Sequence, residues 1–319
     1  MTPSVPIIIN NQEIRQGEFR EVYLNTYRLP SRTVIEIPVY VFRSATPGPK
    51  VLITSGLHGD EINGIEVVKT LLREKHFENL KKGSVIAIPI VNIVAFLNGS
   101  RELPDGKDLN RCFPGTSSGS MGSRIAYDLM TEIIPQINFG VDFHTGGKRI
   151  NNYPQLRCVF SNAENLSLGK KFGAPFILNS PYREKTLRKE AGKLGKPILV
   201  YEAGESMRFN QLAVTEGVKG CLRLLKNTGM LDVAVEESKT KILSGSRWIR
   251  ANVSGLFRTN KKYGSLVNKG EPIGSVSDPF GESESALYAP ARGYIIGINN
   301  MPVVNEGDAL IHIGIEKNA

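Results

Sequence analysis

Two histidines and a glutamate stand where an α/β protein would bring them together. His58 and Glu61 are three residues apart directly after the apolar run 50–55, and His144 ends the apolar run 139–143. An imidazole and a carboxylate three apart at the start of a helix can converge on one point. Two His and one Glu leave the fourth position of a tetrahedral zinc open for water, as in hydrolytic sites. We therefore predict one zinc ion per chain on His58, Glu61 and His144.

Each histidine also has a structural interpretation. His58 alone could cap a helix, and His144 alone could be a hydrogen-bonded core histidine. The joint arrangement favours the metal. His76 follows a charged stretch at a helix end, and His312 alternates with two isoleucines, so both are interpreted as structural.

A glutamate follows another predicted strand. Water activated by a metal needs a base that is near the metal but not bound to it. Glu202 follows the run 197–201. Desolvation makes a charged carboxylate at the end of a buried apolar strand unfavourable, so its presence there indicates a functional role. Glu202 is the predicted base and Glu205 the alternative, although either acid could instead cap the following helix.

The segment 99–115 is too rich in turn residues for regular structure, so we expect an ordered loop. The planar guanidinium of Arg111 can grip a carboxylate with two hydrogen bonds, and Asn110 adds an amide beside it. Arg101 could stand on the other side and stabilise the oxyanion formed when water adds to an amide carbonyl. The alternative is a set of surface arginines on a polar loop.

The elements that must position these residues follow from apolar patterns in the 319-residue chain. The expected strands are 34–42, 50–55, 84–91, 139–144 and 197–202, and the expected helices are 62–72, 123–134 and 211–226. They predict an α/β domain over 1–235 around a largely buried sheet. A polar stretch near 227–246 indicates a linker. Short runs at 248–253, 272–276, 293–298 and 309–313 predict a small all-β domain within 236–319.

Composition excludes some classes and leaves others open. The hydrophobic fraction of 40% and charged fraction of 22% are ordinary for a globular protein, and no apolar run is long enough to cross a bilayer. Without a secretory signal we expect a cytoplasmic protein. Three distant cysteines fit neither a disulfide framework nor a paired-cysteine zinc site. The net charge of +9 comes without any nucleic-acid-binding motif, so we expect neither nucleic acid nor membrane as a partner.

Taken in order, Gly-Leu-His58-Gly-Asp-Glu61, the Asp-Leu-Asn-Arg of the loop 99–115, Asp-Phe-His144 and Glu202-Ala-Gly resemble the succinylglutamate desuccinylase/aspartoacylase family, which is related to the zinc carboxypeptidases. The resemblance implies a three-layer α/β/α mixed-sheet core, zinc on the two histidines and Glu61, and hydrolysis of an N-acyl amide.

Matched motif by motif, the resemblance gives Asn110 and Arg111 to the substrate carboxylate, Arg101 to the oxyanion and Glu202 to the general base. Asp142 lies two residues before His144 on the same strand face, so it could orient that ligand or serve a polar role in the core.

The tail resembles the biotinyl/lipoyl barrel-sandwich pattern. A carrier domain needs a lysine on an exposed hairpin, and Glu282 stands near that position, so we expect neither biotin nor lipoate. The tail then either covers the site or mediates assembly.

These observations predict a zinc-dependent deacylase that hydrolyses a small, carboxylate-bearing N-acyl amino acid, such as an acetylated diamino acid. A metallo-carboxypeptidase or peptide amidase would use the same residues. Alternatives of another class are a zinc-containing binding protein without turnover and a basic nucleic-acid binder. Homo-oligomer formation is left open.

Overall fold

One mixed sheet runs through the structure, a computed structural model that describes residues 5–29, 31–147 and 149–316. The predicted mixed α/β fold is confirmed. The twelve strands of this sheet are, in spatial order, β13 (Leu266–Val267), β16 (Gly293–Asn299), β18 (Ala309–Glu316), β11 (Lys241–Arg250), β9 (Phe176–Asn179), β8 (Ile150–Cys158), β10 (Ile198–Glu205), β7 (Phe139–Gly146), β5 (Lys50–Ser55), β6 (Ser84–Ile88), β4 (Val34–Arg43) and β3 (Phe19–Arg28).

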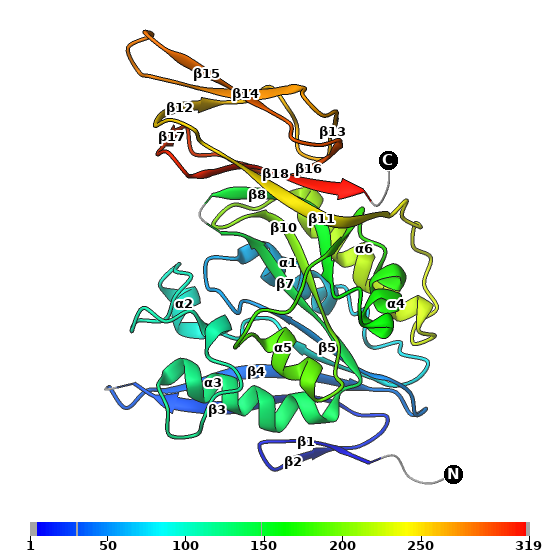
Figure 1. Cartoon of the computed structure of the whole chain (residues 1–319). Helices are drawn as coiled ribbons and strands as arrows, with labels where there is room; N and C mark the ends of the chain where they lie inside the picture. The colour runs from blue at the N-terminus through cyan, green and yellow to red at the C-terminus, as the bar shows by residue number, and fades with distance from the viewer. Residues whose placement is uncertain (1–4, 30, 148, 317–319) are drawn as a thin grey trace.

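Helices cover both faces of the central strands (Figure 1). On one face α1 (Ile62–Arg73), α4 (Ala163–Phe172) and α6 (Gln211–Asn227) share a core with inward side chains of β5, β7 and β10. On the other face α3 (Met121–Asp128) and α5 (Leu187–Lys193) share a second core with side chains of β4, β5 and β6, and α5 contacts β10. Strands covered on both faces read as continuous apolar runs, which is why they were predictable. No helix among the described residues is long and apolar enough to span a membrane. The cytoplasmic location stays a prediction.

The parallel strands bring the candidate residues to one edge. Strands β10, β7, β5 and β6 run parallel, with Glu202 beside His144 and Ser55 beside Phe143 in register. The loops that follow these strands therefore meet at the same edge of the sheet, where α/β proteins bind ligands.

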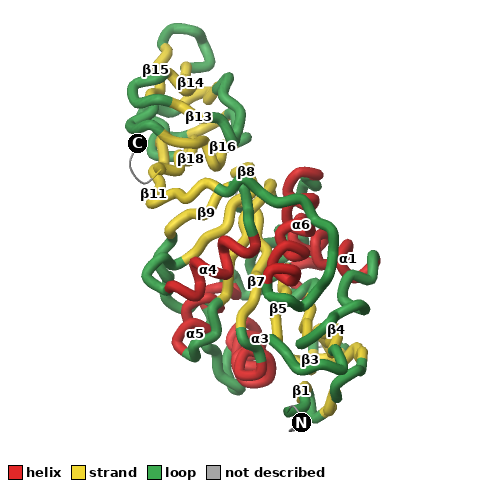
Figure 2. Tube along the Cα trace, turned by 90° about the vertical axis from the view of Figure 1, so that its right-hand side faces the viewer, coloured by secondary structure: helices red, strands yellow, loops and turns green. Residues whose placement is uncertain are grey.

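From Lys241 onward the described chain forms only strands (Figure 2). A second sheet contains β15 (Glu284–Tyr288), β14 (Pro272–Ser277), β12 (Gly255–Arg258) and β17 (Val303–Val304). Residues 251–313 contribute a hydrophobic cluster of their own. We call residues 241–316 the β region. It joins the large sheet twice, because β11 pairs with β9 and β16 pairs with β8. The division of the chain at residue 235 stays a prediction.

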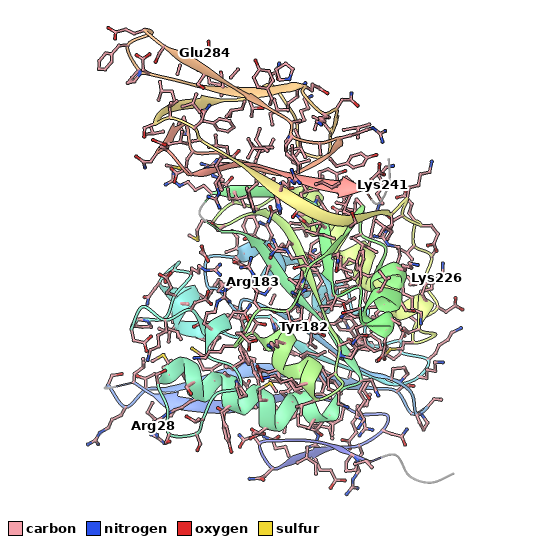
Figure 3. All side chains as sticks on the ribbon, viewed as in Figure 1. Arg28, Tyr182, Arg183, Lys226, Lys241 and Glu284 are labelled. Atoms are coloured by element: carbon pink, nitrogen blue, oxygen red, sulfur yellow. The ribbon has the colours of Figure 1, made fainter. Side chains whose placement is uncertain are left out.

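Three predicted elements differ in extent. The strand predicted over 84–91 ends at Ile88, and the chain turns into the short helix α2 (Ile93–Leu97). The helix predicted over 123–134 is α-helical only to Asp128. It continues as a π-helical turn over Leu129–Ile133 and ends in a 3-10 turn that contains Pro135. The linker expected to 246 ends earlier, because Lys241 already pairs with Phe176. Figure 3 marks Lys226 and Lys241 at the two ends of this connection.

Two small elements complete the chain. A two-stranded sheet of β1 (Ile7–Ile9) and β2 (Gln12–Ile14) lies near the N-terminal end, and a 3-10 turn over Leu109–Arg111 interrupts the predicted loop 99–115.

Candidate metal centre and active site

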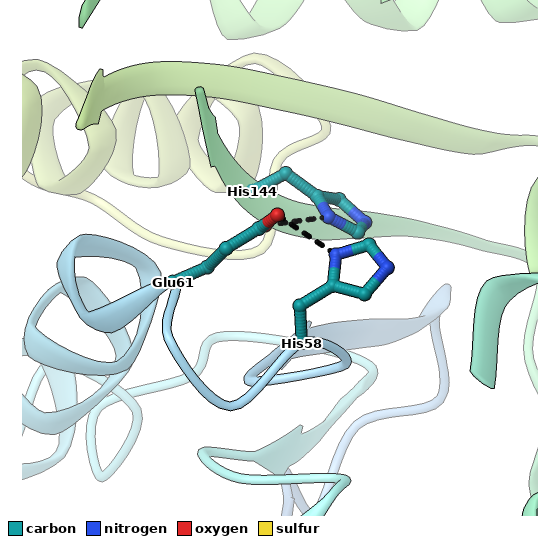
Figure 4. A group of neighbouring side chains, drawn as sticks. All are labelled: His58, Glu61 and His144. Atoms are coloured by element: carbon teal, nitrogen blue, oxygen red, sulfur yellow. Dashed lines mark hydrogen bonds and ion pairs between the residues drawn. The ribbon is translucent and has the colours of Figure 1, made fainter. Parts of the chain in front are cut away.

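His58, Glu61 and His144 converge on one buried point (Figure 4). Nδ1 of His58 lies 2.8 Å from Oε1 of Glu61, and Nδ1 of His144 lies 2.9 Å from Oε2 of the same carboxylate. One candidate ligand atom from each residue lies within 4.8 Å of the others. Two imidazoles and a carboxylate are a donor set that suits zinc.

Local backbone features allow this convergence. Glu61 is the residue immediately before α1, at the end of the loop that connects β5 to this helix. Gly59 passes so close to α2 that a Cβ there would lie 2.0 Å from the carbonyl carbon of Ala95. Only glycine fits that contact, which holds the loop carrying His58 and Glu61 against α2.

The other nitrogen of each imidazole also meets a carboxylate. Nε2 of His58 lies 2.9 Å from Oδ1 of Asp108, and Nε2 of His144 lies 2.7 Å from Oδ2 of Asp142. Carboxylates in this position orient metal-binding imidazoles and fix their tautomers. The arrangement leaves both Nδ1 atoms facing Glu61, so the residues present fit a metal ion. Asp142 lies beside His144, the residue that it was predicted to orient, and that role stays a prediction. No role was predicted for Asp108.

Charges within the group compensate one another. Burial opposes protonation of both imidazoles, but the adjacent carboxylates outweigh it, so the pKa of His58 is raised and that of His144 is raised strongly. Burial likewise opposes ionisation of Glu61, but the two imidazoles hold its pKa well below the usual range. The carboxylates that stabilise the protonated rings would also stabilise a bound cation, which would take the place of the proton on each Nδ1 while Nε2–H still faces an aspartate.

Arg101 lies beside this group, on the wall of the cavity. Its Nη1 is 2.9 Å from Oε1 of Glu61, and its Nη2 is 3.0 Å from Oδ2 of Asp108. Burial lowers the pKa of Arg101, but these two carboxylates outweigh that effect, so its pKa is raised. The guanidinium is therefore held at the metal group by two carboxylates, and its predicted oxyanion role stays a prediction.

Glu202 lies on β10 next to His144 and lines the same cavity. Its carboxylate is held at both oxygens: Nδ2 of Asn152 donates to Oε2 at 3.2 Å, and Nη1 of Arg157 lies 3.2 Å from Oε1. Both partners come from β8. The alternative base, Glu205, is buried, does not line the cavity, and accepts a hydrogen bond of 2.6 Å from Nδ2 of Asn300.

A cavity of about 250 Å³ connects these groups, a size that suits a small ligand. Asn110 and Arg111 lie on its wall, where Oδ1 of Asn110 accepts from the backbone N–H of Leu187 at 3.1 Å. Arg183, labelled in Figure 3, lines the cavity from the segment before α5.

Arg188 is a buried cation on the same wall, only 8% exposed. Its Nη2 donates to the carbonyl of Pro181 at 2.7 Å, while its Nη1 has no hydrogen-bond partner among the described residues. Burial, together with nearby Arg157, lowers the pKa of Arg188 to about 10. A buried guanidinium without an acidic partner is unfavourable unless an anion joins it.

The fold and this group define an α/β protein with a candidate metal site at the carboxyl edge of its sheet. The model of the succinylglutamate desuccinylase/aspartoacylase catalytic domain matches residues 47–228, more than half of the chain. The chain belongs to this family.

Relatives with known names agree with that membership. An N-alpha-acetyl-L-2,4-diaminobutyric acid deacetylase from Halomonas elongata is 28% identical over 293 residues, covering 86% of this chain and 84% of the relative. A succinylglutamate desuccinylase/aspartoacylase structure from Rhodobacter sphaeroides superposes with a TM-score of 0.84 at 27% identity, covering 95% of this chain and 97% of that one. The names denote enzymes that remove acyl groups, which supports amide hydrolysis.

A third protein is similar in fold. The product-bound ectoine utilization protein EutE (DoeB) from Ruegeria pomeroyi has a TM-score of 0.84 at 24% identity, with 98% of each chain covered. The likeness therefore extends through the β region as well as the part that carries the candidate site.

Several residues of the site were not predicted from the sequence. Asp108 had one signal, because it precedes Asn110 in a turn-rich loop and caps the 3-10 turn. Asn152, Arg157 and Arg188 had none, since their approach to the site depends on which strands and helices pair in space.

Proposed function

We propose that this protein is a zinc-dependent deacylase that hydrolyses the amide bond of a small N-acyl amino acid. The observation that carries the proposal is one cavity shared by a buried His-Glu-His group, an arginine beside it and a separate glutamate. A binding protein without turnover would not need the separate glutamate.

In this proposal His58, Glu61 and His144 hold the ion. Zinc, when bound, supplies Lewis-acid activation of water and polarisation of the acyl carbonyl. Glu202 accepts a proton from the attacking water and delivers it to the amide nitrogen as the C–N bond breaks. Arg101 donates N–H to the carbonyl oxygen as negative charge develops there. The products are a carboxylic acid and an amino acid with a free amine.

In the same proposal the substrate's α-carboxylate binds to Arg111, Asn110 and Arg188, which we call the arginine wall. Arg111 and Asn110 were predicted for this role. Arg188 joins them because it lines the same cavity and its buried Nη1 has no hydrogen-bond partner among the described residues. The Halomonas relative is named for an acetylated diamino acid, so N-acetyl diamino acids are among the substrates to be tested.

The first test is metal content by elemental mass spectrometry after purification without chelator, on wild type and His144→Ala. We expect about one zinc per wild-type chain and little in the variant. A panel of N-acetyl, N-succinyl and longer N-acyl amino acids, with dipeptides alongside, then tests the reaction. No zinc uptake even after addition would overturn the proposal, and preference for dipeptides would favour a carboxypeptidase.

A further inference from the structure

Trp248 is an aromatic residue of the cavity wall that comes from outside the matched catalytic domain. It lies on β11, in the β region, and lines the cavity together with the metal group. It is the only tryptophan of the chain, and no other Trp, Tyr or Phe is among the described residues of the cavity wall. The β region therefore supplies part of the candidate active site.

The indole is held in one orientation. Its ring stacks on the imidazole of His312 with centroids 4.1 Å apart and planes 7° apart, and the two residues pair across β11 and β18. His312 is buried, and its Nε2 lies 2.7 Å from Oγ of Ser246. Because one face of the indole is covered by His312 while the side chain stays 36% exposed, the remaining surface is available to a ligand.

The rest of the cavity wall is mostly polar, and several of its groups already have tasks in the proposed function. Glu202, Arg101 and the arginine wall act on the water, the carbonyl and the carboxylate. The acyl chain and the carbon chain of the amino acid's side chain remain, and their hydrocarbon portions are stabilised by apolar contact. The apolar side chains available are Ile150, Val200 and Trp248, and a large flat ring offers the most surface.

We propose that Trp248 is a substrate-contacting residue against which the hydrocarbon part of the N-acyl amino acid packs, and that His312 is a positioning residue that holds the indole there. The inference rests on the proposed function. Either the acyl chain or the amino-acid side chain could supply the hydrocarbon, and the experiment separates them.

The unique tryptophan makes binding visible without turnover. In zinc-loaded Glu202→Gln protein, titration with N-acetyl, N-butanoyl and N-hexanoyl forms of one amino acid tests the acyl chain. N-acetyl forms of glycine, alanine and leucine test the side chain. We expect a saturable shift of Trp248 emission to shorter wavelength, with affinity rising along one series and not the other.

Steady-state kinetics provide the second readout. With the best substrate, Trp248→Ala should raise KM about tenfold and change kcat less than about threefold, because uniform binding is lost. Trp248→Phe should stay within about threefold of wild type in both constants. The matched control is Tyr288→Ala, an exposed aromatic of the same β region that is outside the cavity, and it should match wild type.

The positioning role has its own test. His312→Ala should raise KM as Trp248→Ala does. His312→Phe keeps a flat ring beneath the indole, so its KM should stay near the wild-type value. Unchanged Trp248 emission at saturating substrate, together with wild-type KM in Trp248→Ala, would overturn the inference while hydrolysis by wild type leaves the proposed function standing. Failure of zinc-loaded wild type to hydrolyse any N-acyl amino acid would overturn both.

Discussion

The metal group and the β region each contain buried histidine, and the two environments are opposite. His58 and His144 have carboxylates at both ring nitrogens, whereas His312 has a hydroxyl at one nitrogen and an indole on its face. Burial alone disfavours the imidazolium at all three sites. In the metal group the carboxylates reverse that effect, while at His312 burial and nearby Arg157 lower the pKa to about 3.

The comparison teaches that burial disfavours the imidazolium at every site, and that adjacent carboxylates decide whether this effect is overcome. The first environment is built to hold positive charge, so it suits a metal cation. The second keeps a neutral ring, which suits stacking. The predictions below test the two environments, from the largest expected effect to the smallest.

Glu202→Gln tests whether the carboxylates near the metal group have separate tasks. Loss of the base should lower kcat about 100- to 10,000-fold, while zinc stays near one per chain. Elemental mass spectrometry and steady-state assays measure both. Glu205→Gln is the matched control, since Glu205 lies outside the cavity, and it should keep activity. Loss of zinc in a folded Glu202→Gln protein would make Glu202 a ligand instead.

Asp142→Asn and Asp108→Asn test the carboxylates behind the imidazoles. Each removes a negative charge from a ring nitrogen, so zinc affinity should fall about 10- to 100-fold in competition with a chelator. Asp105→Asn, in the same loop as Asp108 but paired with Lys107, should bind zinc normally. Wild-type affinity in both variants would contradict the orienting role of these carboxylates.

The stability of the β region should fall as the pH falls, because His312 is held neutral whereas the imidazoles of the metal group are held protonated. Unfolded His312 takes up a proton below about pH 6.5, whereas the folded state resists until about pH 3, so this residue costs stability as the pH falls through that window. Between pH 7 and pH 5 the loss is about 2 kcal/mol.

Urea unfolding of zinc-free protein at pH 7 and pH 5 measures this loss. His312→Phe keeps the ring and cannot titrate, so its decline in unfolding free energy should be smaller than that of wild type by that amount. Equal declines would show that His312 is not held neutral.

Gly297→Ala tests how closely the two regions are joined. A Cβ at this position on β16 would lie 2.8 Å from Oδ1 of Asn152, whose amide donates to Glu202. Displacing that hydrogen bond should lower kcat about fivefold. Gly245→Ala, on β11 with no atom within 4 Å of the added Cβ, is the control. Equal activity in the two variants would mean that Asn152 does not position the base.

The parts of the site that could be predicted are those at strand ends. His58, His144, Asp142 and Glu202 each sit on or after a continuous apolar run, so the sequence locates them along the chain and the rule for parallel strands brings them together. The structure brings all four into one cavity or its immediate support. Their roles in catalysis stay predictions.

The unpredicted parts depend on contacts between distant segments. Asn152 and Arg157 reach Glu202 because β8 pairs antiparallel with β10, and no periodicity specifies that partner. Trp248 reaches the cavity because β11 pairs with β9, an edge formed by only four residues. In the fold itself, β8, β9, α4 and α5 carried mixed patterns and were not predicted, for the same reason.

The shared sheet has a consequence for engineering. Strand β9 is hydrogen-bonded to β8 on one side and to β11 on the other. A protein shortened before Lys241 would leave β9 with an open edge of unpaired N–H and C=O groups, which promotes association between copies. A chimaera that exchanged the β region would replace Trp248 as well, so substrate preference and solubility would change in the same step. The two regions are best treated as one unit in protein design.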